Sequence, residues 1–81
     1  MGLSVVWDIE VDAAGLLCPL PVLRARKRLK TMQAGQVLRV LATDPASVID
    51  MPHFCRQSGD TLLAAHQEGA LHVFLIRKGS D

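Results

Sequence analysis

Two prolines in three positions, Pro19 and Pro21, constrain the fold of this chain more than any other feature of its sequence. Proline has a fixed φ and no backbone N–H, so it suits the first turn of a helix and disrupts a helix interior. Before the prolines, residues 7–12 alternate apolar and acidic side chains, as a half-buried strand does. After them, residues 21–33 place apolar side chains at helical spacing. The prolines therefore mark a strand-to-helix junction. Because the residue before a proline avoids the helical region, we expect Leu20 at the helix cap.

The next segment predicts a central strand and the start of a second helix. Gly35 is expected to end the first helix as a C-terminal glycine. Residues 36–43 are apolar on both faces apart from Arg39, which is typical of a central strand. Asp44 followed by Pro45 predicts a helix start, because aspartate caps helix N-termini and proline fits the first turn.

The second helix contains a proline and an apolar stripe. Pro52 is expected to kink this helix or to restart it, with Asp50 as a second possible cap. Val48, Met51 and Cys55 share one predicted face. Their spacing predicts that Cys55 is a buried core thiol.

The order of the elements defines the fold class. Residues 59–60 end the second helix, and residues 61–66 and 71–77 are predicted strands joined by a short turn. The order is therefore β-α-β-α-β-β, and right-handed crossovers put both helices on the same sheet face. We expect an α/β two-layer sandwich, formed by a single domain over residues 1–81, with the other sheet face uncovered.

Composition excludes several classes of protein. The chain has 81 residues, is 49% hydrophobic and carries a net charge of +1, which indicates a small globule without the charge of a nucleic-acid or membrane binder. Its two cysteines and three histidines do not have the spacing of a metal site, so no metal is expected. The first twelve residues lack the features of a signal peptide, and no apolar run has the length of a membrane span. We therefore expect a cytoplasmic protein.

Cys18 lies directly before the prolines, within about one turn of the predicted helix N-terminus. That end carries roughly half a positive charge and free N–H groups, which favour the thiolate and predict a lowered pKa for the Cys18 thiol. The thiolate is the form that attacks or holds sulfur. Placement alone leaves two interpretations open, because a cysteine beside Leu16, Leu17 and Leu20 also suits burial as a small apolar side chain.

The charge run on the predicted helix is entirely positive. It comprises Arg24, Arg26, Lys27, Arg28 and Lys30. Such a run is usually a solvated face. Here no acid supplies the i,i+4 pairs that stabilise a helix surface, so the pattern favours an acidic partner.

The segment DAAGLLCPLPVLRARKRLKTM resembles the signature of the TusA/SirA family of small sulfur carriers, which is a Cys-Pro-x-Pro motif after a first strand. The resemblance continues through ATDPASVIDMPHFC and FLIRKG and covers about residues 12–79. It implies a fold similar to the C-terminal domain of a translation initiation factor, with a four-stranded mixed sheet in the order 1-2-4-3. It also implies that Cys18 is the catalytic residue and carries a persulfide, with no other cofactor, and that Gly15, Pro19 and Pro21 support the motif.

The resemblance further implies partner proteins. The donor would be a cysteine desulfurase or a rhodanese-type protein, and the acceptor a DsrE-type relay protein. In the best-known branch the sulfur ends in 2-thiouridine of tRNA, and other branches serve sulfur oxidation or molybdenum-cofactor assembly. The residues expected to dock partners are Arg24, Arg26, Lys27, Lys30 and Asp44.

Two positions depart from the tRNA-thiolation branch. Leu20 stands where that branch often has an acid, and Ile49 stands where it often has a basic residue. The identity of the partner therefore stays open, although we expect a protein that is monomeric when free and contacts no nucleic acid directly. The alternative from another class of function is a non-catalytic regulatory interaction module.

Overall fold

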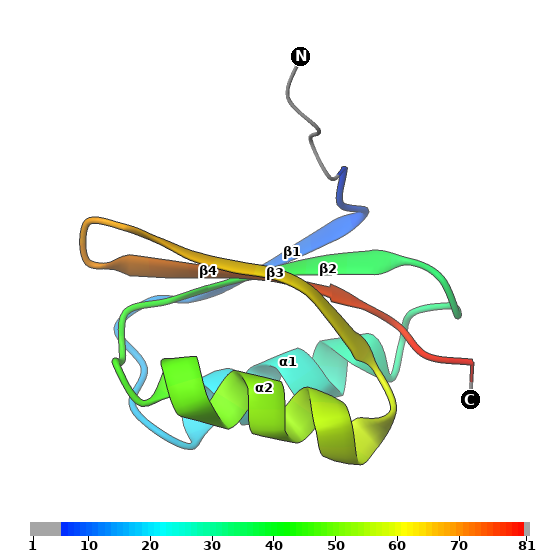
Figure 1. Ribbon diagram of the computed structural model, residues 1–81, viewed down its shortest axis with the longest axis horizontal. Coiled ribbons are helices and arrows are strands. Elements are labelled where there is room, and N and C mark those ends of the chain that lie inside the picture. Colours follow the sequence, from blue (N-terminus) through cyan, green and yellow to red (C-terminus); the bar gives the residue numbers. More distant parts are fainter. Residues whose placement is uncertain (1–5, 81) are drawn as a thin grey trace.

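The computed structural model describes residues 6–80, which form one sheet with two helices packed against it (Figure 1). The elements in chain order are β1 (Ile9–Ala13), α1 (Leu20–Leu29), β2 (Val37–Ala42), α2 (Ser47–Ser58), β3 (Thr61–Glu68) and β4 (Leu71–Arg77). None of the helices in this part of the chain is long and apolar enough to cross a membrane.

The sheet has the order β1-β2-β4-β3, with β1 parallel to β2 and the other neighbouring strands antiparallel. Both helices lie on the same face of this sheet, and the opposite face has no covering element among the described residues (Figure 1). The predicted element order, two-layer architecture and strand order are therefore confirmed.

The core lies between the sheet and the helices. Burial of apolar surface on both layers stabilises this arrangement, at about 25 cal/mol per Å². The helices contribute Ala25, Leu29, Met51 and Cys55, and the sheet contributes Val11, Leu38, Val40, Ala42, Phe74 and Ile76.

The helix α1 is shorter than predicted and begins one residue earlier. Leu20 is its first residue and Pro19 is the cap, so the prediction that Leu20 is the cap is wrong. The helix ends at Leu29, because the next N–H groups of the chain form the tighter bonds of a turn, including Met32 N–H to the Leu29 carbonyl at 3.0 Å. The prediction that Gly35 ends this helix is also wrong. Gly35 lies in the following turn with φ of +93°.

The start of α2 also differs from the prediction. The cap position is Ala46, and Asp44 lies in the turn before it. The Asp44 carboxylate accepts the Ala46 N–H at 3.2 Å, and the Asp44 carbonyl accepts the Ser47 N–H at 3.0 Å. Asp44 therefore shapes the turn that leads into the helix without being its cap.

Two further predictions about α2 can be compared with the structure. The helix continues through Pro52, so this residue does not restart it, and the alternative of a kink stays a prediction. Its buried stripe is Ser47, Met51 and Cys55, whereas Val48 is 52% exposed. A spacing of four residues keeps Ser47 in line with the two later residues, and Val48 falls beside the stripe. The burial of Cys55 is as predicted, and Gly59 ends the helix with φ of +84°.

The uncovered face of the sheet is only partly polar. Glu10 on β1 is exposed, as expected, and its carboxylate pairs with Arg39 at 2.9 Å. The Arg39 guanidinium also lies 4.4 Å from the centre of the Trp7 ring. Arg39 is opposite Leu75 in the register, which places Leu75 on the same face.

Candidate functional site

Cys18 is exposed on the loop between β1 and α1. Two hydrogen bonds fix this loop to the segment between β2 and α2. The Gly15 N–H donates to Thr43 Oγ1 at 2.8 Å, and the Cys18 N–H donates to Asp44 Oδ2 at 2.6 Å. Because both acceptors belong to one neighbouring segment, the backbone that carries the thiol has a defined position.

The three motif-support residues each have a local structural role in the loop. Gly15 has φ of +84°, a conformation that residues with a side chain rarely adopt. Pro21 is buried in the first turn of α1, where its missing N–H has no cost. Pro19 is the cap of α1, and its carbonyl accepts the Leu23 N–H at 3.1 Å. These residues position the loop and the helix start on either side of Cys18.

The electrostatic environment of Cys18 is the reverse of the one predicted. A side-chain hydrogen bond to Asp50 raises the pKa of the Cys18 thiol above its usual value, and the negative charges of Asp50 and Asp44 act in the same direction. The prediction of a lowered pKa is therefore wrong. The N-terminus of α1 offers about half a positive charge, whereas the two aspartates carry a full negative charge each.

The sequence predicts Asp50 only as a possible helix cap. The structure places it in the first turn of α2, from where its carboxylate raises the pKa of the Cys18 thiol. Nothing in the sequence around Asp50 indicates this contact. It depends on how the β1–α1 loop and the start of α2 meet at one end of the sheet.

Exposed apolar side chains flank Cys18. Leu17 on the loop is 70% exposed, and Ile49 in the first turn of α2 is 75% exposed. We call the exposed large apolar side chains of this loop, of α1 and of the first turn of α2 the apolar collar, and it consists of Leu17, Leu20, Leu23, Val48 and Ile49. Large apolar side chains left exposed at the surface are typical of a protein-contact site.

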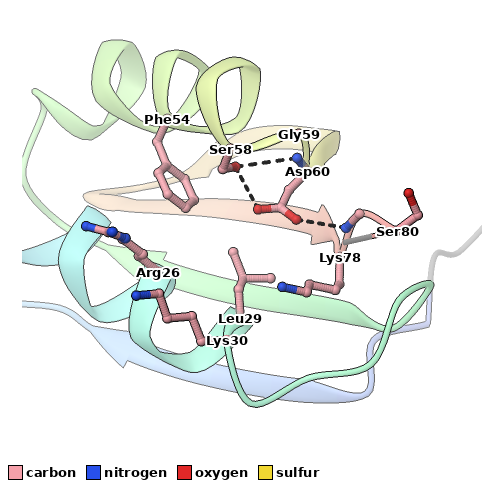
Figure 2. Close-up of a pocket in the computed structure, with 10 residues that line it drawn as sticks. Arg26, Leu29, Lys30, Phe54, Ser58, Gly59, Asp60, Lys78 and Ser80 are labelled. Atoms are coloured by element: carbon pink, nitrogen blue, oxygen red, sulfur yellow. Dashed lines mark hydrogen bonds between the residues drawn. The ribbon is translucent and has the colours of Figure 1, made fainter.

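The basic residues predicted to dock partners line neighbouring depressions of the surface, one of which, of about 230 Å³, is shared by Arg26, Lys27 and Lys30 with Leu23. Arg24 and Lys27 line a shallow depression of about 240 Å³ together with side chains of the apolar collar. Arg26 and Lys30 line a larger cavity near the C-terminal ends of the two helices (Figure 2). Asp44 is partly buried and holds the backbone of Cys18. The structure therefore brings only some of the predicted docking residues together beside the thiol.

Cys55, the second thiol, is 3% exposed and packs in the core. Burial raises the pKa of Cys55 to about 11, with a smaller effect from the charge of Asp60. A thiol in this environment is neutral at physiological pH and inaccessible to a protein partner.

Comparison with known proteins shows a family match over nearly the whole chain. The family model described as Sulfurtransferase TusA matches residues 9–78. The Sulfur carrier protein TusA of Allochromatium vinosum is 53% identical over 72 residues, which are 89% of this chain and 95% of that protein. The protein of the same name from Pseudomonas entomophila is 40% identical over 78 residues, which are 96% of this chain and 98% of that protein.

A solved structure agrees with the sequence matches. The crystal structure of a SirA-like protein from Desulfitobacterium hafniense superposes with a TM-score of 0.78 at 28% sequence identity. The superposition covers 90% of this chain and 100% of that chain.

Proposed function

This chain belongs to the TusA sulfurtransferase family, and we propose that it is a sulfur carrier that holds sulfur as a persulfide on Cys18. The observation that carries the proposal is the contrast between the two thiols. Cys18 is exposed on a loop with a fixed backbone, whereas Cys55 is buried in the core. A carrier that receives sulfur from one protein and passes it to another needs its thiol at the surface, and Cys18 meets this requirement.

The proposed transfer consists of two thiol-exchange steps. The Cys18 thiolate attacks the outer sulfur of a donor persulfide, a new S–S bond forms, and the donor cysteine leaves as a thiolate. The thiolate of an acceptor protein then attacks the terminal sulfur on Cys18, and Cys18 leaves as a thiolate. Each step forms one S–S bond and breaks another, so no external oxidant or reductant is needed.

The aspartates beside Cys18 make the first transfer step depend on charges that the partner brings. They favour the neutral thiol in the free protein. A cation of the docked partner placed against Asp50 would offset this effect and favour the thiolate. The resting carrier would then be less reactive than the carrier in complex with its donor.

We further propose that the donor is a cysteine desulfurase or a rhodanese-type protein, that a DsrE-type protein accepts the sulfur, and that the pathway leads to tRNA 2-thiouridine. Sulfur oxidation and molybdenum-cofactor assembly are the alternative pathways. The apolar collar next to Arg24 and Lys27 supports docking by a partner with apolar and acidic side chains. Leu20 and Ile49 both belong to this collar, so the two departures from the tRNA-thiolation branch lie where they would affect partner choice.

The experiment that tests the function is sulfur loading. The purified protein is incubated with a cysteine desulfurase and cysteine, and its peptides are weighed by mass spectrometry. We expect the peptide that contains Cys18 to gain the mass of one or more sulfur atoms. A folded protein that gains no sulfur from any desulfurase or rhodanese donor would instead support a non-catalytic interaction module.

A further inference from the structure

We propose that the cavity near the C-terminal ends of α1 and α2 binds a small organic anion, with a negatively charged group on an apolar body (Figure 2). The cavity has a volume of about 600 Å³, which is within the range of small-molecule sites. The ten residues of α1 lead from Leu20, near Cys18, to Leu29 at this cavity. Since a helix rises about 1.5 Å per residue, the two sites lie roughly 15 Å apart along α1.

Three cationic side chains line the cavity. Arg26 lies in the last turn of α1, Lys30 is the C-cap residue four positions later, and Lys78 lies on the segment after β4. Figure 2 shows the α1 pair and Lys78 on opposite sides of Leu29 in this view. Within residues 6–80 the ion pairs formed are Arg39–Glu10 and His66–Glu68. None of the three cations is therefore paired with an acid of this part of the chain.

Stabilisation of a helix end does not account for all three charges. Cations at the C-terminal end of a helix interact favourably with its carbonyls, and this effect applies to Arg26 in the last turn of α1 and to Lys30 at its C-cap. Lys78 belongs to no helix, and yet it lines the same cavity. Convergence of charges from two separate elements is what an anion site requires.

An acid also lines the cavity, but its oxygens are already engaged. Asp60 Oδ2 accepts a hydrogen bond from Ser58 Oγ at 2.7 Å, and Oδ1 accepts one from the Gly79 N–H at 2.8 Å. Figure 2 shows the Asp60 carboxylate between these two donors. Asp60 therefore reduces the local positive charge without forming an ion pair with any of the three cations.

The wall that carries Lys78 is fixed before any ligand binds. The Lys78 N–H donates to the Gln36 carbonyl at 2.8 Å, and the Lys78 carbonyl accepts the Gly35 N–H at 2.9 Å. A Cβ atom on Gly79 would lie 2.3 Å from the Gly59 carbonyl oxygen, so the two backbones approach as closely as glycine allows. A preformed wall lowers the entropic cost of binding.

Two apolar residues of the cavity indicate the chemistry of the uncharged part of the ligand. Leu29 is buried and Phe54 is partly buried, and Figure 2 shows the Phe54 ring extending from α2 toward the space beside Leu29. An aromatic ring and a leucine favour an apolar body. The cavity therefore suits an aromatic or aliphatic carboxylate, sulfonate or phosphate better than an inorganic anion.

The test uses 1-naphthyl phosphate as the probe, titrated into the isotope-labelled protein and followed by NMR amide shifts. Inorganic phosphate and 1-naphthol are the two halves of the probe. We expect saturable shifts at Lys30, Phe54 and Gly79, with each half binding at least about tenfold more weakly than the whole probe. Shifts that do not saturate, or that centre on Cys18, would overturn the proposal, as would inorganic phosphate binding as tightly as the probe.

Charge-matched variants separate a built site from general attraction. Arg26→Gln with Lys78→Gln removes two cations of the cavity, and Arg24→Gln with Lys27→Gln removes two cations that do not line it. The cavity pair should weaken binding of the probe about tenfold or more, and the matched pair less than about twofold. Equal weakening by both pairs would show a solvated basic surface without a site. The proposal does not depend on sulfur carriage, because probe binding and loading of Cys18 are measured separately.

Discussion

The two cysteines have the same chemical group in opposite settings. Cys18 is exposed on a loop, and Cys55 is 3% exposed in the core. The pKa of each thiol is raised, but for Cys18 the main cause is the hydrogen bond to Asp50, and for Cys55 it is burial. A partner can neutralise a carboxylate at the surface, but it cannot expose a core side chain without unfolding. The two thiols therefore differ less in acidity than in two other respects. A partner can reach Cys18 and can offset the cause of its raised pKa, and it can do neither for Cys55.

The largest difference should appear in sulfur loading. We expect Cys18→Ala to abolish the gain of sulfur from a desulfurase, because no other exposed thiol is present in the chain. Cys55→Ala should load as the unmodified chain does. Mass spectrometry of the intact proteins measures both. Persistent loading of Cys18→Ala, combined with its loss in Cys55→Ala, would reverse the assignment.

Alkylation without any partner should separate the thiols by rate. Cys55 reacts only when the structure opens, and opening of core segments costs most of the free energy of unfolding. We expect iodoacetamide to modify Cys18 at least about a hundredfold faster than Cys55 in the native protein. In denaturant the two rates should approach each other. Comparable native rates would contradict the buried position of Cys55.

Stability at high pH should depend on Cys55. Its pKa is about 11 in the folded state against 9.0 for a free thiol, so the unfolded chain loses its proton first. The native state then binds more protons, and the free energy of unfolding falls as the pH rises from about 9 to 11. We expect this group to account for at most about 3 kcal/mol, because each unit of pKa difference corresponds to about 1.4 kcal/mol.

The control for this stability effect is Cys55→Ala. Denaturant unfolding of both proteins is followed across the same pH range, and other titrating groups contribute equally to each. The difference between the two curves should shrink as the pH rises. A constant difference would show that ionisation of Cys55 has no part in the stability.

Sequence patterns predicted the scaffold better than the environment of the thiol. Local signals such as the alternation in β1 and the spacing of Ala25 and Leu29 report burial directly, so the elements and their order were predictable. The contact between Cys18 and Asp50 joins residues from separate elements. Because it depends on the packing of a loop against a neighbouring helix, local spacing could not reveal it, and the predicted direction of the pKa shift was wrong.

The same limit applies to the basic helix. Its charge run was predicted to act as one docking surface. In the structure Arg24 and Lys27 lie beside Leu20 and Leu23, whereas Arg26 and Lys30 line the cavity at the other end, and Lys27 also shares a depression with Arg26 and Lys30. Helical periodicity predicts which residues share a face of the helix. It does not predict which other elements pack against that face, because this depends on how α1, α2 and the segment after β4 come together.

Charge reversal tests how the exposed thiol meets its partner. We expect Arg24→Glu with Lys27→Glu to slow sulfur transfer with the cognate partner about tenfold at low salt, since opposed charges steer the encounter. The effect should shrink as salt rises, because the Debye length is about 8 Å at physiological ionic strength. Transfer is measured by stopped reactions and mass spectrometry.

The matched control for this experiment reverses Arg56 and Arg77, which are exposed on other elements. It changes the net charge by the same amount and should slow transfer less than about twofold. If both double variants slow transfer equally, the total charge matters and the position beside the apolar collar does not.

The smallest expected effect concerns the acidity of Cys18 itself. Asp50→Asn removes the nearest carboxylate charge, so the pKa of the Cys18 thiol should fall and the alkylation profile should move to lower pH. Below that pKa, each unit of decrease raises the thiolate fraction about tenfold and lowers the nucleophilicity of the thiolate about threefold, which leaves a net gain of about threefold. Iodoacetamide rates against pH, measured in a Cys55→Ala background, give both quantities. Glu68→Gln removes an exposed acid on β3 and should leave the profile unchanged. An unchanged profile in Asp50→Asn would show that the acid does not control the resting thiol, and the difference between Cys18 and Cys55 would then depend on access alone.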